Sequence, residues 1–240
     1  MLTTYLKFAF RTFWKDRFYA ILNIVGLATG IAVSVLMLLY LQNDLTYDQH
    51  HTQHEQIYRL VTNIKGPGVE LHPATAAREL APMLAEDYPE ILAFVRIEQM
   101  ESTLVQQGTE RYNEDRWMRA DSSVFSVFTY PFLAGSPAQA LRDKHSVVLT
   151  ETTAQRDFGK EEALGQTLLL HEDQTPYTVT GVMEDLPDNS HLKFDALVSE
   201  ISPRQGFNAE AGEFVSESLW NPDVYTYLLF SEDYDPASFF

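Results

Sequence analysis

One stretch constrains the fold of this chain more than any other. Residues 18–41, FYAILNIVGLATGIAVSVLMLLYL, contain no charged side chain. As a helix rising about 1.5 Å per residue, this stretch would measure roughly 36 Å, enough to cross a hydrocarbon core about 30 Å thick with some tilt. Its apolar core is too long for a signal peptide, and no A-x-A-like cleavage site follows it. The sequence therefore predicts one uncleaved transmembrane helix over residues 18–41.

The charge changes sign across this stretch. The chain has 17 basic and 34 acidic residues, of which four basic residues and one acidic residue lie in residues 1–17. The other 13 basic and 33 acidic residues lie in residues 42–240, which gives that part a net charge of −20. Because Lys and Arg concentrate in the cytoplasmic flanks of membrane helices, we expect a cytoplasmic N-terminus and an extracytoplasmic domain over residues 42–240.

The acidic balance of residues 42–240 excludes some functions. Nucleic-acid binding needs a basic face, so no nucleic-acid partner is expected. The domain is also unsuited to lying flat on anionic lipid. The chain has no cysteine, which excludes disulfides and thiolate metal sites.

Residues 1–17 have a helical period of their own. Apolar residues fall on one side of a helical wheel, and Lys7, Arg11 and Lys15 recur every fourth residue on the other. Trp14 is typical of the membrane edge. This pattern predicts an amphipathic interfacial helix on the cytoplasmic face of the lipid membrane, which either anchors the topology or contacts a cytoplasmic partner.

Four small or polar residues share one face of the predicted span, namely Asn23, Gly26, Gly30 and Ser34. A small-xxx-small ladder lets two helix backbones approach closely in lipid, although glycine is also common in membrane helices in general. We expect this face to pack against another helix. No second hydrophobic stretch of that length occurs in the sequence, so the neighbour is expected from another subunit or from sequence beyond residue 240.

The histidines after the span raise the question of a metal site. His50 and His54 would lie one helical turn apart on a continuing helix, with His51 between them. A structural zinc site usually has four ligands, and a catalytic site has three and an open position. A solvated turn next to the membrane is the preferred interpretation, and no metal or cofactor is assigned.

The rest of the chain mixes strands and helices without strict alternation, which predicts an α+β domain. A helix is expected over residues 73–88, bent or divided at Pro82. A second is expected over residues 151–158, capped by Thr150 and followed by Gly159. Strands are expected at residues 56–64, 91–107, 113–118, 146–149, 166–171, 177–183, 193–198 and 223–230.

Motifs for catalysis are missing from the sequence. There is no G-x-x-x-x-G-K-[ST] phosphate loop and no G-x-S-x-G elbow. Ser190 and His191, with Asp185 or Asp188, hint at a catalytic triad, but a D-x-P-D-N-S-H run fits a turn better. No catalytic residue is assigned, and we expect a protein that is not an enzyme.

Several short motifs occur in an order typical of one family. They include Asn23-Ile24-x-Gly26-Leu27-x-x-Gly30, Asp44-Leu45-Thr46-Tyr47-Asp48 with His51, Ile57-Tyr58-Arg59-Leu60, Ser146-Val147-Val148-Leu149-Thr150-Glu151 and Asn189-Ser190-His191. In this respect the chain resembles MacB/FtsX-like ABC transporter permeases over essentially its whole length. His50 departs from the pattern, since that family commonly has phenylalanine before the histidine.

The resemblance implies an architecture and a role. It implies a permease of the bacterial inner membrane whose later helices follow this segment, so that the chain is an N-terminal piece. The extracytoplasmic domain would have two lobes with mixed or antiparallel sheets: a porter-like lobe at about 50–114 and 201–240, and an inserted lobe at about 115–200.

The expected partners follow from the same resemblance. They are a separate cytoplasmic ABC ATPase, a second permease copy or paired permease, and a possible periplasmic partner. ATP hydrolysis on the ATPase would move the external domain for export, extraction or signalling. The alternatives are a single-span anchored sensor or assembly module without an ATPase, and a membrane-anchored hydrolase.

Overall fold

The computed structural model describes residues 11, 14–15, 17–66, 68–159, 162–171, 174–199, 222–232 and 234. The chain divides into two compact units, Met1–Tyr47 and Asp48–Phe240. Each unit is described by itself.

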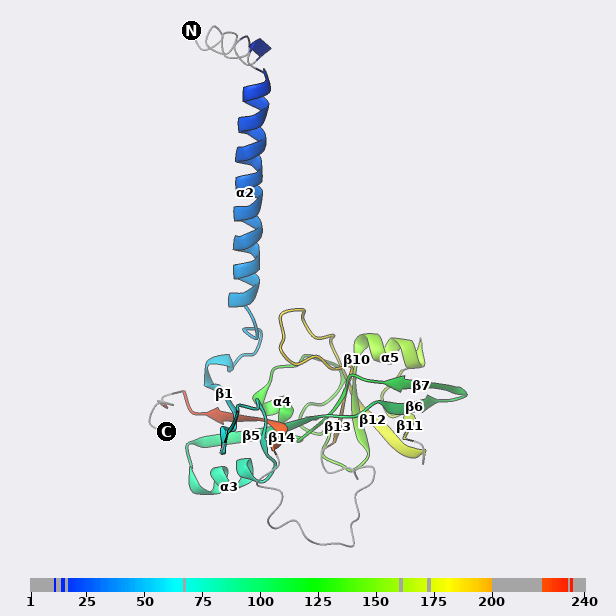
Figure 1. The fold of residues 1–240 in the computed structure, drawn as a ribbon. Coiled ribbons are helices and arrows are strands. Elements are labelled where there is room, and N and C mark those ends of the chain that lie inside the picture. The colour runs from blue at the N-terminus through cyan, green and yellow to red at the C-terminus, as the bar shows by residue number, and fades with distance from the viewer. Residues whose placement is uncertain are drawn as a thin grey trace. The chain divides into compact units, whose positions relative to one another are not determined.

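The first unit contains the long helix α2, Arg17–Leu45 (Figure 1). It is 29 residues long, has no buried residue, and is long and apolar enough to cross a membrane. Its threonine and its serine are satisfied within the helix, because Thr29 Oγ1 donates to Val25 O and Ser34 Oγ donates to Gly30 O, each at 2.8 Å. Such internal bonds suit a helix in lipid, where no water is present to accept them. The predicted span of residues 18–41 lies inside this helix.

In the residues that the structure describes, the second unit is built on a 12-stranded mixed sheet. One end of the sheet has the order β1-β14-β5-β8, with all three pairings antiparallel. These strands are β1 (Ile57–Leu60), β14 (Pro222–Phe230), β5 (Ile91–Gln99) and β8 (Trp117–Ala120). Val95 and Ile97 alternate with more exposed neighbours along β5, as expected for a strand packed on a core.

The sheet continues from β8 as β13-β10-β12-β11-β6-β7. These strands are β13 (Ala196–Ser199), β10 (Ser146–Thr150), β12 (Thr175–Met183), β11 (Thr167–Leu170), β6 (Thr103–Gln107) and β7 (Glu110–Glu114). The pairs β8–β13 and β10–β12 are parallel, and the others along this path are antiparallel. The predicted α+β class with mixed strands is therefore confirmed.

Four shorter strands complete the pairing. β4 (Ala76–Ala77) pairs with β14, and β9 (Phe132–Gly135) pairs with β12. β2 (Ile64–Gly66) and β3 (Val69–Leu71) form a separate antiparallel hairpin. Gly135 has φ +84°, and a Cβ there would lie 2.5 Å from Thr180 O. Only glycine therefore lets β9 approach β12 this closely.

The helices of the domain are short. They are η1 (His54–Gln56), α3 (Leu80–Asp87), α4 (Val124–Val127) and α5 (Glu151–Phe158). The prediction for α5 is confirmed, because the Thr150 side chain caps its first turn by accepting from Thr153 N, and Gly159 follows with φ 64°.

The predicted helix at residues 73–88 is only partly right. Residues 76–77 pair with β14, and the helix begins at Leu80. Pro82 consequently lies in the first turn of α3, where its missing N–H has no partner to lose, and it does not divide the helix.

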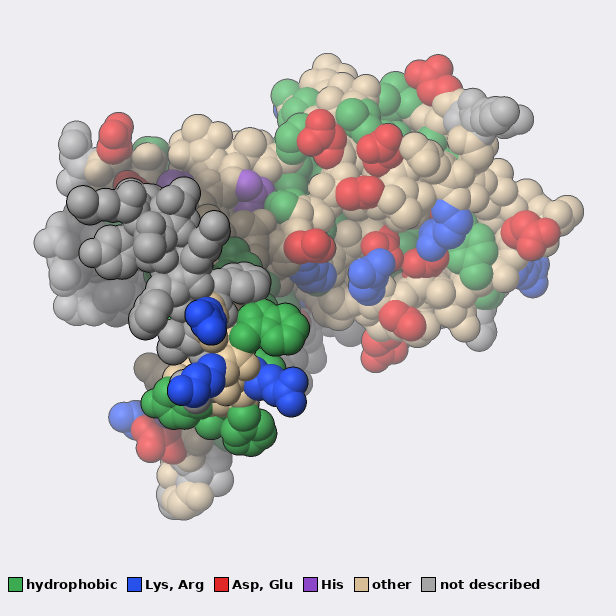
Figure 2. Space-filling view, turned by 90° about the horizontal axis from the view of Figure 1, so that it is seen from above, with side chains coloured by type: hydrophobic (Ala, Val, Ile, Leu, Met, Phe, Trp, Pro, Cys, Tyr) green, Lys and Arg blue, Asp and Glu red, His purple; other side chains and the backbone are tan. Residues whose placement is uncertain are grey.

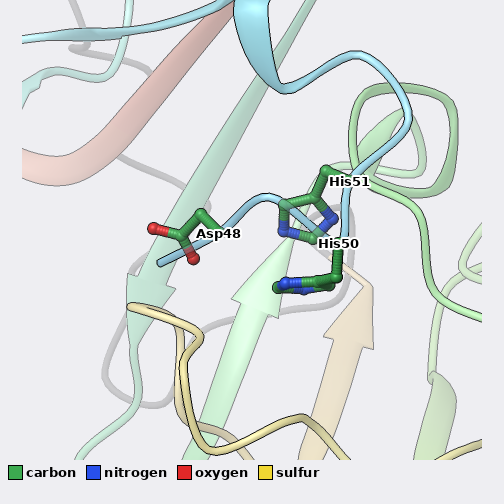
Figure 3. A group of neighbouring side chains, drawn as sticks. All are labelled: Asp48, His50 and His51. Carbon is green, nitrogen blue, oxygen red and sulfur yellow. The ribbon is translucent and has the colours of Figure 1, made fainter. Parts of the chain in front are cut away.

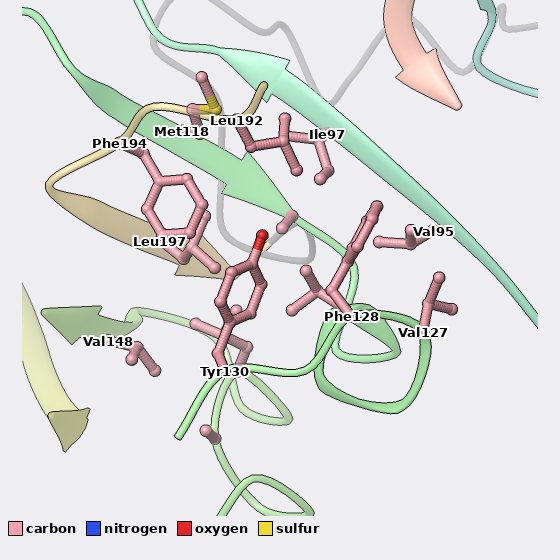
Figure 4. Packing of buried hydrophobic residues seen from close by; sticks show 14 of the residues in the cluster. Val95, Ile97, Met118, Val127, Phe128, Tyr130, Val148, Leu192, Phe194 and Leu197 are labelled. Carbon is pink, nitrogen blue, oxygen red and sulfur yellow. The ribbon is translucent and has the colours of Figure 1, made fainter. Parts of the chain in front are cut away.

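Aromatic and branched side chains fill the core on one side of the domain (Figure 4). Tyr130 and Phe128 project into a cluster that includes Val95, Ile97 and Leu197. The Tyr130 ring meets that of Phe194 edge-on at a centroid distance of 5.6 Å, a favoured aromatic geometry. A second cluster, which contains Trp117 and the inner residues of β10, β11 and β12, lies around α5.

The predicted lobe boundaries stay a prediction. The prediction places residues 103–114 in the porter-like lobe. In the structure β6 pairs with β11, a strand of the region 115–200, and β7 pairs with β6. Residues 201–221 lie outside the described part of the chain. Figure 2 shows Asp and Glu side chains spread over the visible face of the domain, in keeping with the acidic balance of the sequence.

Candidate functional site

The first element of the site is the turn that begins at Asp48, three residues after the last residue of α2. Asp48 has a positive φ of 59°, a conformation that aspartate tolerates better than most residues. Its N–H donates to Asn189 O at 2.9 Å, and its Oδ1 accepts from His191 N at 2.9 Å. These reciprocal bonds fasten the turn to a loop 143 residues away in sequence.

A series of hydrogen-bonded polar side chains runs from this turn to strands β14 and β1. His191 Nδ1 lies 2.8 Å from Asp48 Oδ2, which favours the imidazole proton on Nδ1. His191 Nε2 is 2.6 Å from the hydroxyl of Tyr227 on β14, and that hydroxyl then donates to it. Burial raises the pKa of Tyr227, although Arg59 on β1, which bonds to the same hydroxyl, lowers it in part. We call Asp48, His191, Tyr227 and Arg59 the polar chain.

The polar chain forms one wall of a cavity of about 450 Å³. The other lining residues are His51, His54, Ile57 and Phe128. The cavity thus combines an aromatic wall, a carboxylate, a guanidinium and several imidazoles. We call it the histidine pocket.

His51 is the most enclosed imidazole of the pocket, with 2% of its surface exposed. Its ring packs between Phe128 and Tyr130, at centroid distances of 4.9 and 5.5 Å. Burial, together with the neighbouring His50, lowers the pKa of His51 to about 4, so the ring is neutral at pH 7. Its Nδ1 accepts from Thr129 N at 3.1 Å, which places the remaining proton on Nε2.

Several imidazole nitrogens in the pocket and next to it are buried without a hydrogen-bond partner. They are Nε2 of His51 and both ring nitrogens of His50. Burial also lowers the pKa of His50, with Asp48 acting in the opposite direction. An unpaired buried polar group typically costs about 1–3 kcal/mol, so these atoms mark a place where a ligand would add stability.

These same side chains can hold a metal ion. Asp48, His50 and His51 each offer one ligand atom, and the three atoms lie within 4.8 Å of one another. Figure 3 shows the two imidazoles one above the other, with nitrogen atoms on the side that faces Asp48. The expected continuation of the helix past the span is wrong, because α2 ends at Leu45 and residues 46–53 form turns, so His50 and His54 do not lie one helical turn apart on a helix.

The catalytic alternative finds no support in the geometry. The carboxylate next to His191 belongs to Asp48, whereas Asp185 accepts bonds from the N–H and hydroxyl of Thr152. Ser190 is fully buried, and its hydroxyl has no hydrogen-bond partner, so it is not paired with a base. A nucleophile needs both access and an adjacent base.

The site residues predicted from the sequence lie elsewhere in the molecule. Asn23, Gly26, Gly30 and Ser34 are exposed on α2, and a Cβ added at either glycine would meet nothing within 4 Å. Their packing against another helix stays a prediction. Lys7 lies outside the described residues, whereas Arg11, Trp14 and Lys15 are helical and exposed.

Sequence reasoning missed Tyr227 as a member of the site and did not pair Asp48 with His191. A signal was present, because Asp48, His51 and Asn189-Ser190-His191 are among the family-like motifs. The structure brings these motifs, distant in sequence, to one turn and its neighbouring loop.

A second buried polar group lies on β7 and α5. Arg156 Nη2 is 2.7 Å from Glu114 Oε1, and Arg156 Nε is 2.7 Å from Asp157 Oδ1. Burial raises the pKa of Glu114, while the charge of Arg156 opposes that shift. We call Glu114, Arg156 and Asp157 the Arg156 cluster.

Comparisons with known proteins agree with this description. The family of MacB-like periplasmic core domains matches residues 20–234. Among solved structures, a domain of a protein named as a permease from Porphyromonas gingivalis has a TM-score of 0.63 and 22% identity, covering 78% of each chain. A comparison with curated proteins gave no match.

Two further structures are more distant in fold. The periplasmic region of MacB from Actinobacillus actinomycetemcomitans has a TM-score of 0.49 and 14% identity, covering 76% of this chain and 78% of its own. The extracellular domain of the ABC-type transporter YknZ from Gram-positive bacteria has a TM-score of 0.48 and 14% identity, covering 74% and 84%. Because the family match spans most of the sequence, this chain belongs to the family of MacB-like periplasmic core domains.

Proposed function

We propose that this chain is part of the membrane subunit of a MacB/FtsX-type ABC transporter. In this role it couples ATP hydrolysis by a separate cytoplasmic ATPase to movements of its extracytoplasmic domain. The family match supports the permease class, and the sequence has no phosphate loop with which to hydrolyse ATP alone.

The observation that carries the proposal is the attachment of Asp48 to the domain. Only residues 46 and 47 separate the end of α2 from Asp48. A displacement of the helix end therefore acts on Asp48 through a very short piece of chain. Asp48 in turn holds His191, which contacts Tyr227 in the sheet. This continuous bonded route gives membrane movements a path into the domain.

The membrane topology follows from the charge distribution. The N-terminal arm with Arg11, Lys15 and Arg17 is placed in the cytoplasm, next to the ATPase, and residues 42–240 are placed in the periplasm. The small-residue face of α2 then packs against a helix of the same subunit or of a paired permease. The domain acts on a periplasmic substrate or partner, as a two-lobed body with the boundaries given above.

Affinity purification of the full-length protein from membranes tests this function. We expect a P-loop ATPase to co-purify, and ATP analogues to change hydrogen exchange in the extracytoplasmic domain. A single-span sensor would give neither result. Recovery of the protein without any ATPase, together with unchanged exchange, would overturn the proposal.

The small-residue face provides a second, local test. Replacing Gly30 by Leu fills a face where an added Cβ meets nothing within the chain. We expect Gly30→Leu to weaken recovery of partner membrane subunits. Val35→Leu, a change of an exposed α2 residue on the opposite side of the helix from the predicted face, serves as the matched control. Equal recovery with both variants would remove this face from the proposal.

A further inference from the structure

We propose that Asp48, His50 and His51 bind one divalent transition-metal ion of the zinc class. This inference does not depend on the permease function. It rests on the convergence of three donor side chains, on their unpartnered atoms and on the cavity beside them.

The donor atoms of the three side chains lie close together. The three ligand atoms lie within 4.8 Å of one another, and the nitrogen-bearing edges of both rings face Asp48 (Figure 3). Zinc binds imidazole nitrogen and carboxylate oxygen at about 2.0–2.2 Å, so the donors must draw together modestly around an ion. The cavity of about 450 Å³ beside Asp48 and His51 leaves room for this movement and for a water molecule as fourth ligand.

The two histidines have ring nitrogens that are free to bind an ion. His51 is 2% exposed, and its Nε2 has no hydrogen-bond partner. His50 lacks partners at both ring nitrogens.

His191 supports the third ligand. Its backbone N–H and Nδ1 both approach the Asp48 carboxylate, at 2.9 and 2.8 Å. A carboxylate has about four lone-pair positions, so Asp48 can keep these contacts and still ligate an ion. Such surrounding bonds orient a ligand and hold it ready for the metal.

The hydrogen bond between Thr129 and His51 has to break when the ion binds, which provides a specific test of the site. Thr129 N–H donates to His51 Nδ1, so His51 Nε2 carries the proton without metal. Coordination through Nε2 shifts that proton to Nδ1, which then can no longer accept from Thr129 N–H, so this bond breaks. A single neutral hydrogen bond is weak compared with metal coordination by three ligands. Metal binding is therefore expected to expose the Thr129 amide to exchange.

The donor set selects the kind of ion. Imidazole favours Zn²⁺, Cu²⁺ and Ni²⁺, whereas Mg²⁺ and Ca²⁺ prefer oxygen ligands. Two imidazoles and one carboxylate match the ligand set of zinc sites that keep an open fourth position. All three ligands lie between residues 48 and 51, so the ion would stiffen the turn that follows α2.

Calorimetric titration of the full 240-residue chain in detergent tests the site, with Zn²⁺ alone as the probe and Mg²⁺ as comparison. We expect one zinc ion per chain and no measurable Mg²⁺ binding. His50→Gln and Asp48→Asn should each weaken zinc binding at least tenfold. His54→Gln, which changes another imidazole of the same pocket, should alter it less than threefold.

His50→Gln is the decisive variant, because His51→Gln removes a buried ring and can prevent folding. Circular dichroism establishes that the His50 variant is folded. Exchange at the Thr129 amide, measured with and without Zn²⁺, supplies a reading that adventitious surface binding would not change. Absence of one-site binding in the wild type, or equal zinc affinity in His50→Gln, would overturn the proposal.

Discussion

The histidine pocket and the Arg156 cluster both bury polar side chains, but they differ in how far those groups satisfy one another. In the Arg156 cluster each carboxylate has an oxygen 2.7 Å from the same guanidinium, and a single oxygen of the cluster, Oδ2 of Asp157, is buried without a hydrogen-bond partner. Around the histidine pocket, Nε2 of His51, which lines the cavity, and both ring nitrogens of the adjacent His50 have no hydrogen-bond partner. Mutually paired charges are typical of structural packing, whereas unpartnered donors beside a cavity are typical of a binding site.

The two groups also differ in how their segments meet. The Arg156 cluster joins β7 to the last turn of the neighbouring helix α5. The polar chain joins the turn after α2 to a loop, to β14 and to β1. Removing a member of the first group should therefore affect mainly stability. Removing a member of the second should affect communication between segments.

The largest expected effect comes from the Arg156 cluster. Arg156→Met leaves Glu114 and Asp157 buried without a cation. We expect a loss of about 3 kcal/mol in the free energy of unfolding, the lower end of values for broken buried pairs, because Arg156 itself is half-exposed. Denaturant unfolding of the full chain measures it. Zinc affinity should stay at the wild-type value, and a matching loss there would break the distinction between the two groups.

A pH effect of intermediate size is expected from the histidine pocket. In the folded chain the pKa of His51 is about 4, against an ordinary value of 6.5. Between these values the unfolded state binds more protons than the folded state. The contribution of His51 to the free energy of unfolding is therefore complete above pH 6.5 and is lost as the pH falls towards 4. From pH 7 to pH 5 the loss should be about 2 kcal/mol.

Unfolding measured at both pH values with a chelator present checks this prediction. His51→Phe, which keeps an aromatic ring at this buried position, is the control, since it lacks the titrating group and should lose about 2 kcal/mol less over the same interval. Equal pH dependence in the two proteins would contradict the assignment. The contribution of Glu114 to stability depends on pH in the opposite direction. Burial raises the pKa of Glu114, so its contribution stabilises the folded state more as the pH falls.

The smallest expected change in stability belongs to Asp48→Asn. The amide keeps the size of the side chain but removes the charge beside His191. Because both side chains are partly exposed, we expect about 1–2 kcal/mol in unfolding free energy. Asp44→Asn, the same change at an exposed position four residues earlier, should have almost no effect. Equal effects of the two variants would show that the polar chain does not hold the turn.

Local parts of this fold follow from sequence, and long-range parts do not. The capped helix α5 was predictable because Thr150, Thr153 and Gly159 act within one short segment. Residues 76–77 looked helical, but their pairing with β14, about 145 residues away, overrides that local preference.

The site shows the same division. The histidines were visible in the sequence as a group, but their geometry depends on where α2 ends. The partnership of Asp48 with His191 joins residues 143 positions apart, which no periodic pattern or local spacing reveals. The family-like motifs indicated which residues matter, but only the fold shows that these residues lie together.

Hydrogen exchange of this protein together with the proposed ATPase tests the central claim most directly, because two of the bonds concerned contain exchangeable amides. The Asp48 N–H binds Asn189 O, and the His191 N–H binds the Asp48 carboxylate. With an ATP analogue, we expect exchange to change together in segments 44–52 and 186–194. In Asp48→Asn the change should persist in the first segment and be lost in the second. Wild-type protein whose segment 186–194 does not respond would contradict the account.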